Sequence, residues 1–445
     1  MSFKAPAAMS STAAAGMSSA AAAGMSSAVQ ATARDDAESA DRADVLAPIR
    51  TLFQLPEGVI YLDGNSLGAA PVAVTPLLED VVTRQWGQDL ITSWNVNGWW
   101  ELPARLGNQV GALIGAAAGQ VVCGDSTSVQ LFQALVAACR LRPGRTVILT
   151  DGANFPTDQY IADSVARLLG LEVIRCRPSE VAEHLDERIA VASFSLVDYR
   201  TGELFDADEV TRAVHRAGAL MLWDLCHAAG ALPVSLDAIQ ADFAVGCTYK
   251  YLNGGPGSPA FIYLAERHQG TVDLPLTGWN GHRTPFQLAQ HYQAAESIEQ
   301  ARIGTPPLLS LAALGAGLAV FDQAQAESGS ALEDIRAKSL ALTDRAIAFA
   351  DSTLADYGVE VVTPRDHRRR GSQVSLRMDH AFEVCQALIA RGVIGDFRAP
   401  DLLRLGFTPL YLRHVDVHDA MTVLVDVLES KSYLDPSYAS RATVT

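Results

Sequence analysis

The chain is organised around the stretch Ala241-Asp-Phe-Ala-Val-Gly-Cys-Thr-Tyr-Lys-Tyr-Leu-Asn-Gly-Gly-Pro-Gly257. An apolar run with the composition of a strand stops at Tyr249-Lys250-Tyr251, and a Gly/Pro turn follows. Lysine is normally excluded from the end of a buried strand because an isolated ammonium is costly to desolvate. A lysine that does lie there is suited to Schiff-base chemistry as a nucleophile. On this stretch alone a strand tip that simply reaches solvent is the favoured interpretation of Lys250, so the rest of the chain decides.

Length and composition restrict the possible classes of protein. A chain of 445 residues predicts one large and one smaller domain. Its 34 basic and 50 acidic residues give a net charge of −16, which argues against sequence-independent binding to nucleic acid. Six scattered cysteines without a CxxC pair indicate reduced thiols in a cytoplasmic protein, with no disulfide framework and no metal site. No run of 18 apolar residues is free of Gly and charge, so we expect no transmembrane helix.

The first 40 residues are of low complexity, and residues 13–20 are repeated as residues 21–28. Ala, Gly and Ser bury too little surface to offset the ordering entropy, so the sequence predicts a disordered tail over 1–40. A targeting peptide is the alternative, but a single early lysine and no Leu-rich core disfavour a secretory signal. We expect residues 41–70 to contribute to the small domain, 71–305 to form the large domain, 306–435 the small domain and 436–445 a tail.

Strands and helices alternate between residues 120 and 264, which is typical of an α/β fold. The pattern predicts a mainly parallel sheet with helices on both faces. The expected strands are 120–124, 146–150, 171–174, 189–195, 219–223 and 261–264. After Pro306-Pro307 a helical stretch leads to a second, smaller α/β pattern over 359–428.

Two earlier motifs allow more than one interpretation. Gly64-Asn-Ser-Leu-Gly68 matches the G-x-S-x-G elbow of serine hydrolases, but prolines follow closely and no βαβ unit precedes it, which disfavours a hydrolase elbow. Four tryptophans fall within fifteen residues: Trp86, Trp94, Trp99 and Trp100. They suit either core packing or a pocket for a planar ligand.

Several polar residues follow strand ends or begin helices, and ligands bind at that edge of such a sheet. Thr127 and Ser128 begin a helix and offer a phosphate site, although an ordinary helix cap is the alternative. Phe155 could cover a ring face, three residues before Asp158. Asp224 at a strand tip could hold a protonated pyridine nitrogen, and His227 could face the same ring. As a set, the order phosphate site, ring cover, ring-nitrogen acid and lysine indicates one cofactor site.

With these residues in view, the chain resembles the kynureninases, pyridoxal-phosphate enzymes of the aspartate-aminotransferase fold, from about Tyr61 to Tyr411. The resemblance implies that fold, with a large domain of mainly parallel sheet and a smaller α/β domain. The motifs that carry it are Tyr61-Leu-Asp-Gly-Asn-Ser-Leu-Gly68, Trp94-Asn95, Gly98-Trp99, Asp125-Ser-Thr-Ser-Val129, Asn154-Phe-Pro-Thr-Asp158, Asp224-Leu-Cys-His227, Cys247-Thr-Tyr-Lys-Tyr-Leu-Asn253, Gly278-Trp279, Gly281-His282 and Gly304-Thr-Pro-Pro307.

The resemblance implies a role for each residue that contacts the cofactor, pyridoxal 5'-phosphate. Lys250 would bind it through a Schiff base and later move the α-proton of the substrate. The remaining expected cofactor contacts are the phosphate ligands Thr127, Ser128 and Tyr249, the ring neighbours Phe155 and Asp158, the ring-nitrogen partner Asp224, and Ser195 and His227. A carboxylate at the pyridine nitrogen keeps it protonated, so that the ring acts as an electron sink.

Three further residues are assigned by the same resemblance. Trp279 and Thr305 resemble positions that reach into the site from a neighbouring subunit, which implies a homodimer. Arg404 resembles the arginine that holds the substrate carboxylate, and a guanidinium fork suits a bidentate carboxylate. The chain departs from the family pattern at Gly254-Gly255, where an alanine is more usual, and at Asn280, where an aromatic residue is more familiar. The second departure affects the preference between ring-hydroxylated and plain substrates.

The activity implied is hydrolysis of L-kynurenine to anthranilate and L-alanine, in tryptophan catabolism, with 3-hydroxy-L-kynurenine as a second candidate substrate and a link to NAD biosynthesis. One alternative on the same fold is a cysteine desulfurase or selenocysteine lyase, which needs a mobile cysteine late in the chain. Cys385 is the only late cysteine, and its apolar helical surroundings indicate a core thiol. The other alternative is a protein that binds pyridoxal phosphate without catalysis.

Overall fold

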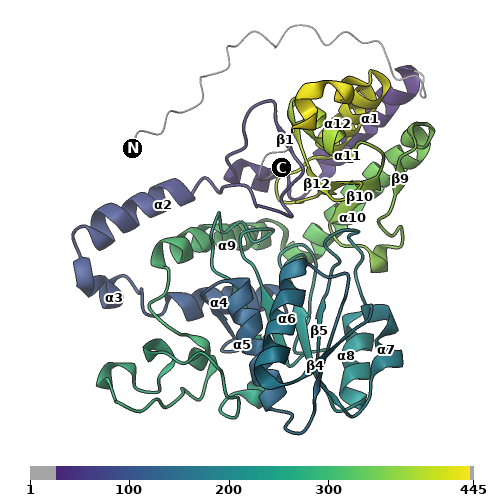
Figure 1. The fold of residues 1–445 in the computed structure, drawn as a ribbon. Coiled ribbons are helices and arrows are strands. Elements are labelled where there is room, and N and C mark those ends of the chain that lie inside the picture. Colours follow the sequence, from purple (N-terminus) through teal and green to yellow (C-terminus); the bar gives the residue numbers. More distant parts are fainter. Residues whose placement is uncertain (1–26, 441–445) are drawn as a thin grey trace.

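A seven-stranded sheet forms the centre of the protein in the computed structural model, which describes residues 27–440 (Figure 1). The strands are ordered β2-β8-β7-β6-β5-β3-β4. From β7 to β4 neighbouring strands run parallel, whereas β8 is antiparallel to both of its neighbours. The predicted α/β fold with a mainly parallel sheet is therefore confirmed. The strands are β2 Val121–Cys123, β3 Val147–Thr150, β4 Glu172–Arg175, β5 Ile189–Ser195, β6 Leu220–Asp224, β7 Phe243–Gly246 and β8 Phe261–Leu264.

Helices cover both faces of this sheet because alternate strand residues point to opposite sides, and each side is apolar. The helices α5 (Thr127–Arg140) and α6 (Pro156–Leu169) pack on one face, beside Ile148 and Leu222. The opposite face carries Leu149 and Trp223. It is covered by α4 (Leu102–Leu113), α8 (Ala207–Arg216) and α9 (Leu308–Ser328), and the short α7 (Val181–His184) packs on α8.

A second, four-stranded antiparallel sheet has the order β12-β13-β10-β9. Its strands are β9 Glu360–Val361, β10 Gln373–Arg377, β12 Asp396–Arg398 and β13 Leu402–Gly406. The helices α10 (Ala331–Phe349), α11 (Ala381–Ile389) and α12 (His414–Glu429) pack around it. The early strand β1 (Ile60–Tyr61) pairs in parallel with β11 (Val393–Ile394), so residues far apart in sequence lie side by side. The predicted division of the chain at residues 40, 70, 305 and 435 stays a prediction.

The helix α1 (Ser27–Ala43) occupies part of the expected N-terminal tail. It packs against α12, where Ala37 is buried and Arg34 forms an ion pair with Asp419. The carboxylate of Asp41 accepts hydrogen bonds from the backbone N–H groups that begin α12. The prediction of disorder is therefore wrong for residues 27–40. The segment has few large apolar residues, but its polar contacts with α12 hold it in place. Residues 1–26 lie outside the described residues.

The expected C-terminal tail is similarly part of the fold at its start. Pro436–Ala439 form a helical turn that packs against α11. The side chain of Asp435 accepts from the backbone N–H of Ser437 and begins this turn. Residues 441–445 lie outside the described residues.

The helix α9 is long and apolar enough to cross a membrane by length and composition. It lies inside the fold, with Leu311, Leu314 and Leu318 fully covered. A Cβ atom at Gly317 would lie 2.4 Å from the carbonyl oxygen of Leu252, so α9 packs directly on the turn that follows Lys250. Because it packs on α2, α4 and α10, we interpret α9 as a core helix.

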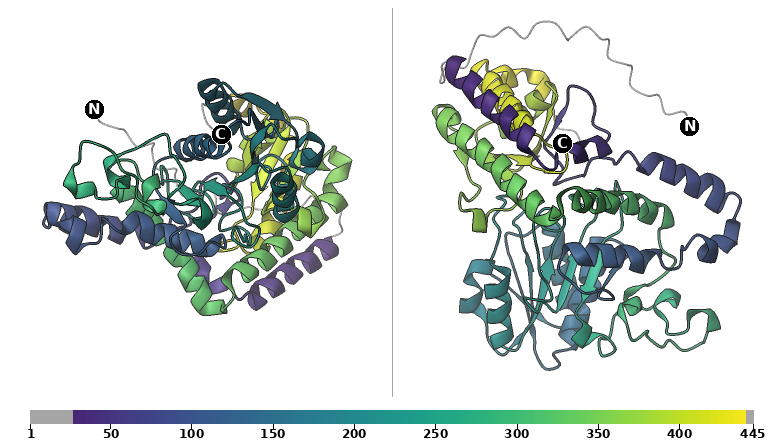
Figure 2. Two further views of the ribbon diagram at one scale, coloured as in Figure 1. Left: turned by 90° about the horizontal axis from the view of Figure 1, so that it is seen from below. Right: turned by 180° about the vertical axis from the view of Figure 1, so that it is seen from behind.

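Two segments project from the same side of the molecule (Figures 1 and 2). One contains α2 (Val74–Asp80), a π-helical turn (Val81–Trp86) and α3 (Ser93–Val96), and we call it the helical arm. The other, residues 265–305, consists of loops and short turns. Both expose large apolar side chains, including Ile91 and Leu288.

Candidate active site

The lysine lies in a tightly packed turn after β7. The strand ends at Gly246, earlier than the apolar run predicts, because the backbone N–H of Cys247 turns to Sγ of Cys226 at 3.2 Å. The backbone N–H of Gly68 donates to the carbonyl of Tyr249 at 2.7 Å. A Cβ atom at Gly68 would lie 2.3 Å from the carbonyl oxygen of Lys250. The early Gly-Asn-Ser-Leu-Gly segment therefore clamps the lysine turn.

Nζ of Lys250 lies 2.9 Å from Nε2 of His227. The imidazole is buried, and its Nδ1 has no hydrogen-bond partner within the described residues. Burial, the ammonium of Lys250 and the guanidinium groups of Arg404 and Arg398 lower the pKa of His227 well below its ordinary value. His227 is therefore a neutral imidazole at neutral pH, with one ring nitrogen left for a ligand.

The carboxylate of Asp224 lies at the carboxyl end of β6, beside Ser195 at the end of β5. Oγ of Ser195 donates to Asp224 at 3.2 Å, and the backbone N–H of Cys226 donates to the other oxygen at 2.7 Å. These two donors orient the carboxylate toward the edge of the sheet where the lysine turn lies. The structure thus brings together four predicted residues: Ser195, Asp224, His227 and Lys250.

The start of α6 adds two more predicted residues. Asp158 is buried and accepts from the side-chain amide of Asn154 at 2.9 Å. Burial and the charge of Asp224 raise the pKa of Asp158 well above its ordinary value, so the two carboxyl groups are close neighbours. Phe155 is half exposed and meets the ring of Tyr199 edge to face at 5.3 Å. Asn154 and Tyr199 were not assigned roles from the sequence, because their contacts with Asp158 and Phe155 become visible only in the structure.

A cavity of 560 Å³ lies at the start of α5. Ser126 caps the helix by accepting from the backbone N–H of Val129, and Thr127, Tyr249 and Thr305 line the cavity. Burial and the thiols of Cys247 and Cys226 raise the pKa of Tyr249, so its phenol is a neutral donor. A phosphate suits this set of hydroxyls at a helix N-terminus. Ser128 follows at the next helical position and does not line the cavity.

Trp279 lies in an aromatic cluster and not in that cavity. Its ring centroid is 5.7 Å from that of Trp100 and 6.0 Å from that of Phe286. Trp100 also contacts Trp94, and the guanidinium of Arg302 stacks over its ring at 4.5 Å. A cavity of 780 Å³ beside this cluster is lined by residues that include Trp100, Asn280 and Phe286. The tryptophan-rich segment thus borders a hollow large enough for a planar ligand.

Arg404 lies on β13. Its side chain is only 1% exposed and is surrounded by hydrogen-bond acceptors. Its Nε donates to Oδ1 of Asp396 at 2.8 Å, Nη1 to the carbonyl of Tyr199 at 2.6 Å, and Nη2 to Oγ of Ser66 at 2.9 Å. Ser66 thereby belongs to an arginine cluster, so the hydrolase elbow is wrong as an interpretation of Gly64–Gly68. No helix follows that serine directly: β1 has two residues and a turn follows.

Asp396 and Arg398, which share this cluster with Arg404, were not assigned a role from the sequence. Both lie on β12, two residues apart, and therefore point to the same side of the strand. Asp396 is opposite Arg404 in the sheet register. An acidic and a basic residue at alternate positions of one strand, followed by a strand with a central arginine, is a sequence pattern that could have indicated this cluster.

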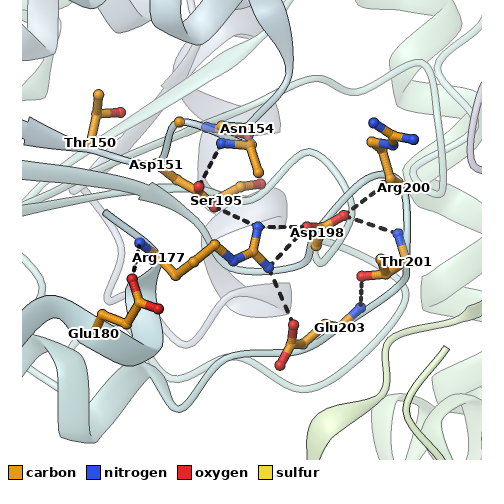
Figure 3. A network of polar contacts seen from close by, with 12 residues as sticks. Thr150, Asp151, Asn154, Arg177, Glu180, Ser195, Asp198, Arg200, Thr201 and Glu203 are labelled. Atoms are coloured by element: carbon orange, nitrogen blue, oxygen red, sulfur yellow. Dashed lines mark hydrogen bonds and ion pairs between the residues drawn. The ribbon is translucent and has the colours of Figure 1, made fainter. Parts of the chain in front are cut away.

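A second polar network holds the hairpin of residues 197–204 (Figure 3). Arg177 forms ion pairs with Asp151, Asp198 and Glu203 at 3.1–3.3 Å. Asp198 also accepts from the backbone N–H groups of Arg200 and Thr201. The hairpin carries Tyr199, whose ring meets Phe155 and whose carbonyl accepts from Arg404. Arg177 therefore stabilises the element that joins the ring cover to the arginine cluster.

The late cysteine of the desulfurase alternative is a core thiol. Cys385 is buried in α11, and its Sγ lies 3.6 Å from the carbonyl of Gly395. Burial raises the pKa of the thiol to about 12. It lacks the thiolate character and the access that a catalytic cysteine needs.

The chemistry of these groups fits the predicted cofactor. A cavity with hydroxyl donors, a carboxylate at a strand tip, a half-exposed aromatic ring and an amine surround one edge of the sheet. The unpartnered Nδ1 of His227 and the neutral phenol of Tyr249 are polar groups that a bound ring and its phosphate would satisfy.

Known proteins share both the sequence and the fold. A family model described as the kynureninase C-terminal domain matches residues 335–424. A kynureninase of Burkholderia pseudomallei is 49% identical over 420 residues, which cover 93% of this chain and 99% of that protein. A kynureninase of Pseudomonas fluorescens is 45% identical over 422 residues, which cover 93% of this chain and 100% of that protein.

Solved structures show the same fold at low identity. The apo cysteine desulfurase of Thermococcus onnurineus has a TM-score of 0.72 at 18% identity and covers 86% of this chain and 98% of its own. A C-DES variant with glycine linked to its PLP cofactor has a TM-score of 0.72 at 14% identity, covering 85% and 99%. These two likenesses show the fold alone, whereas the sequence matches extend along nearly the whole chain. The chain therefore belongs to the kynureninase family.

Proposed function

We propose that this protein hydrolyses L-kynurenine to anthranilate and L-alanine with pyridoxal 5'-phosphate as its cofactor. The observation that carries the proposal is the group at the sheet edge, where Lys250 contacts a neutral, buried His227 next to Asp224. Family membership supports the substrate, because relatives that are 45% and 49% identical along nearly the whole chain are kynureninases. The desulfurase alternative is not favoured, since Cys385 is a buried core thiol.

Each residue of the site has a task that follows from its position. When bound, pyridoxal phosphate supplies an electron sink for negative charge at the α-carbon of the substrate. Lys250 would hold the cofactor through Nζ and, once the substrate has displaced it, would take the α-proton. Neutral His227 holds Nζ by accepting a hydrogen bond at 2.9 Å. Asp224, oriented by the hydroxyl of Ser195, would pair with the ring nitrogen. Thr127 and the phenol of Tyr249 would donate to the phosphate of the cofactor.

The arginine cluster and the aromatic cluster would hold the two ends of the substrate. Arg404 would bind the α-carboxylate, and the hollow beside Trp100 and Asn280 would receive the aminophenyl ring. Water adds to the γ-carbonyl carbon, and the bond between the β and γ carbons then breaks. Lys250 would return a proton to the β-carbon. The products are then anthranilate and alanine.

The test is release of anthranilate fluorescence from L-kynurenine by purified protein with added pyridoxal phosphate. Lys250→Arg keeps the charge but cannot form the Schiff base, so we expect a loss of about three orders of magnitude. Lys431→Arg makes the same change at an exposed lysine and should keep the parent rate. Turnover of Lys250→Arg at the rate of Lys431→Arg would remove the lysine from the mechanism.

We infer further that the protein is a homodimer with Trp279 and Thr305 at sites shared across the interface. The support is the apolar surface of the two projecting segments, where Ile91 is 75% and Leu288 79% exposed. Apolar surface of this kind marks a protein–protein contact. Ile91→Asp and Leu288→Asp should shift the mass in light scattering to a monomer with reduced activity. Leu168→Asp, at a leucine of α6 that is 63% exposed, is the control.

We also propose a cytoplasmic location and a role in tryptophan catabolism. The six cysteines are unpaired thiols, five of them buried, which suits a reducing compartment. The ratio of anthranilate to 3-hydroxyanthranilate formed from the two substrates decides whether the enzyme serves NAD biosynthesis. Faster cleavage of the 3-hydroxy substrate would support that route, and faster cleavage of kynurenine would oppose it.

A further inference from the structure

The fork of Arg404 is largely occupied by protein acceptors. A guanidinium has five N–H donors. Those of Arg404 are directed to both oxygens of Asp396, to Oγ of Ser66 and to the carbonyl of Tyr199. At 1% exposure it has at most one N–H left for a substrate. Arg404 alone therefore cannot present the free bidentate edge that a carboxylate prefers.

The guanidinium of Arg398 lies beside that of Arg404 and has N–H donors without a protein acceptor. Nη2 of Arg398 donates to Oδ2 of Asp396 at 2.6 Å and to Oγ of Ser66 at 3.3 Å, the same two acceptors that Arg404 uses. Its side chain is 31% exposed, and its Nε is a buried donor without a partner within the described residues. Arg398 is the member of the pair that still offers N–H groups.

Arg404 and Arg398 also act electrostatically on His227, the residue that contacts Lys250. The guanidinium groups of Arg404 and Arg398 both contribute to lowering the pKa of His227, after burial and the charge of Lys250. Burial and the neighbouring Arg404 lower the pKa of Arg398 itself, and Asp396, the carboxylate that both cations share, opposes this shift only in part. A further anion between the arginines and His227 would balance this charge.

We propose that Arg398 is a second substrate-binding arginine, which completes with Arg404 and Ser66 the site for the α-carboxylate of the substrate. The proposal rests on the function proposed above and extends it to substrate recognition. Arg404 and Asp396 form the buried base of the site, and Arg398 supplies N–H groups that have no protein acceptor. The substrate carboxylate accepts from Nε or Nη1 of Arg398 and from the remaining N–H of Arg404. Amino acids are thereby preferred over amines that lack the carboxylate.

The experiment compares Arg398→Gln, Arg398→Lys and Arg377→Gln. Arg377 lies on β10 of the same sheet and forms an exposed ion pair, so it is the matched control. For Arg398→Gln we expect KM for L-kynurenine to rise about 10- to 100-fold with a smaller change in kcat. The inhibition constant of kynuramine, which lacks the carboxylate, should stay within about twofold of the parent value. Arg398→Lys should recover part of the loss because it keeps the charge.

Two results would overturn the proposal. One is an unchanged KM for kynurenine in Arg398→Gln. The other is an equal rise in the KM of kynurenine and the inhibition constant of kynuramine, which would indicate a structural role. Binding of L-alanine and of ethylamine, followed by the cofactor absorbance, tests Arg398 without turnover. If the parent protein releases no anthranilate but Arg398→Gln selectively weakens alanine binding, the proposed function is wrong and the arginine assignment stands. Weakened ethylamine binding to the same extent would contradict the assignment.

Discussion

Asp63 and Asp396 are two carboxyl groups that interact in the arginine cluster, although they lie more than 300 residues apart in the chain. Burial and the charge of Asp396 raise the pKa of Asp63 to about 7. The groups that face Asp63 are Tyr61, Ser66, Asp396, Arg398 and Arg404. Its protonation state therefore changes the charge of the proposed carboxylate site within the working pH range.

The first prediction concerns the affinity for the substrate carboxylate. Below pH 7 Asp63 is protonated, so the two arginines face a single carboxylate and attract an anionic substrate. As pH rises through about 7, Asp63 ionises and KM for kynurenine should rise about tenfold. In Asp63→Asn the rise should be absent, as measured by initial rates between pH 6 and 8.5. A profile with the same rise in Asp63→Asn would assign the titration to another group.

The second prediction concerns stability in acid. Because the folded pKa of His227 is depressed, the unfolded chain takes up its proton first, at about pH 6.5. The stability contribution is complete above that pH and is lost as pH falls toward the folded pKa. When the pH falls from 7.5 to 5.5, the Tm of His227→Gln should therefore decrease less than the Tm of the parent. The pKa of His418, on α12, is also lowered by burial, so His418→Gln shows how much any such histidine contributes.

The third prediction concerns Arg177. Arg177→Gln leaves the buried carboxylates of Asp151 and Asp198 without their cation, at a cost of about 2 kcal/mol of unfolding free energy. The hairpin that carries Tyr199 should loosen, and kcat/KM should fall about tenfold. Denaturant unfolding and initial rates measure both effects. Arg175→Gln removes an exposed ion pair with Asp163 and should change neither; equal losses in both variants would argue against a specific network.

The fourth prediction concerns the contact between Gly68 and the lysine turn. In Gly68→Ala the new methyl group would meet the carbonyl of Lys250, which is backbone and cannot rotate away. We expect a loss of about 1–3 kcal/mol in stability and a displaced lysine. The absorbance of the cofactor at saturation reports that displacement. Gly144→Ala, at a glycine whose Cβ would have no neighbour within 4 Å but whose φ is +87°, separates backbone strain from steric overlap.

The sequence predicted the sheet and the polar residues at its edge because both follow local patterns. Buried strands are continuous apolar runs, and Asp224 and Thr127 come directly after them or begin the next helix. The antiparallel direction of β8 and the pairing of β1 with β11 depend on long-range contacts that no local pattern contains. Helix α1 docks on α12 through the buried Ala37 and through polar contacts of Arg34 and Asp41, whose partners lie near the other end of the chain.

The same distinction applies to the site. Lys250, Asp224 and His227 could be placed because each follows a strand, and the structure brings them together. Asp396, Arg398 and the carbonyl of Tyr199 could not, because their importance depends on which side chain lies opposite in a second sheet. The departure at Asn280 could be noted from the sequence, but its position beside the aromatic hollow required the structure.

The hairpin of residues 197–204 belongs to the chain of the large sheet, yet its backbone carbonyls bond to the small one. Tyr199 accepts from Arg404 and Gln373, and Thr201 accepts from Oγ1 of Thr363. These hydrogen bonds join the part of the chain that forms the large sheet and carries the lysine turn to the strands that carry Arg404 and Gln373. Substitutions along this row of hydrogen bonds, outside the site itself, are a route by which sequence drift can alter both substrate affinity and rate at once.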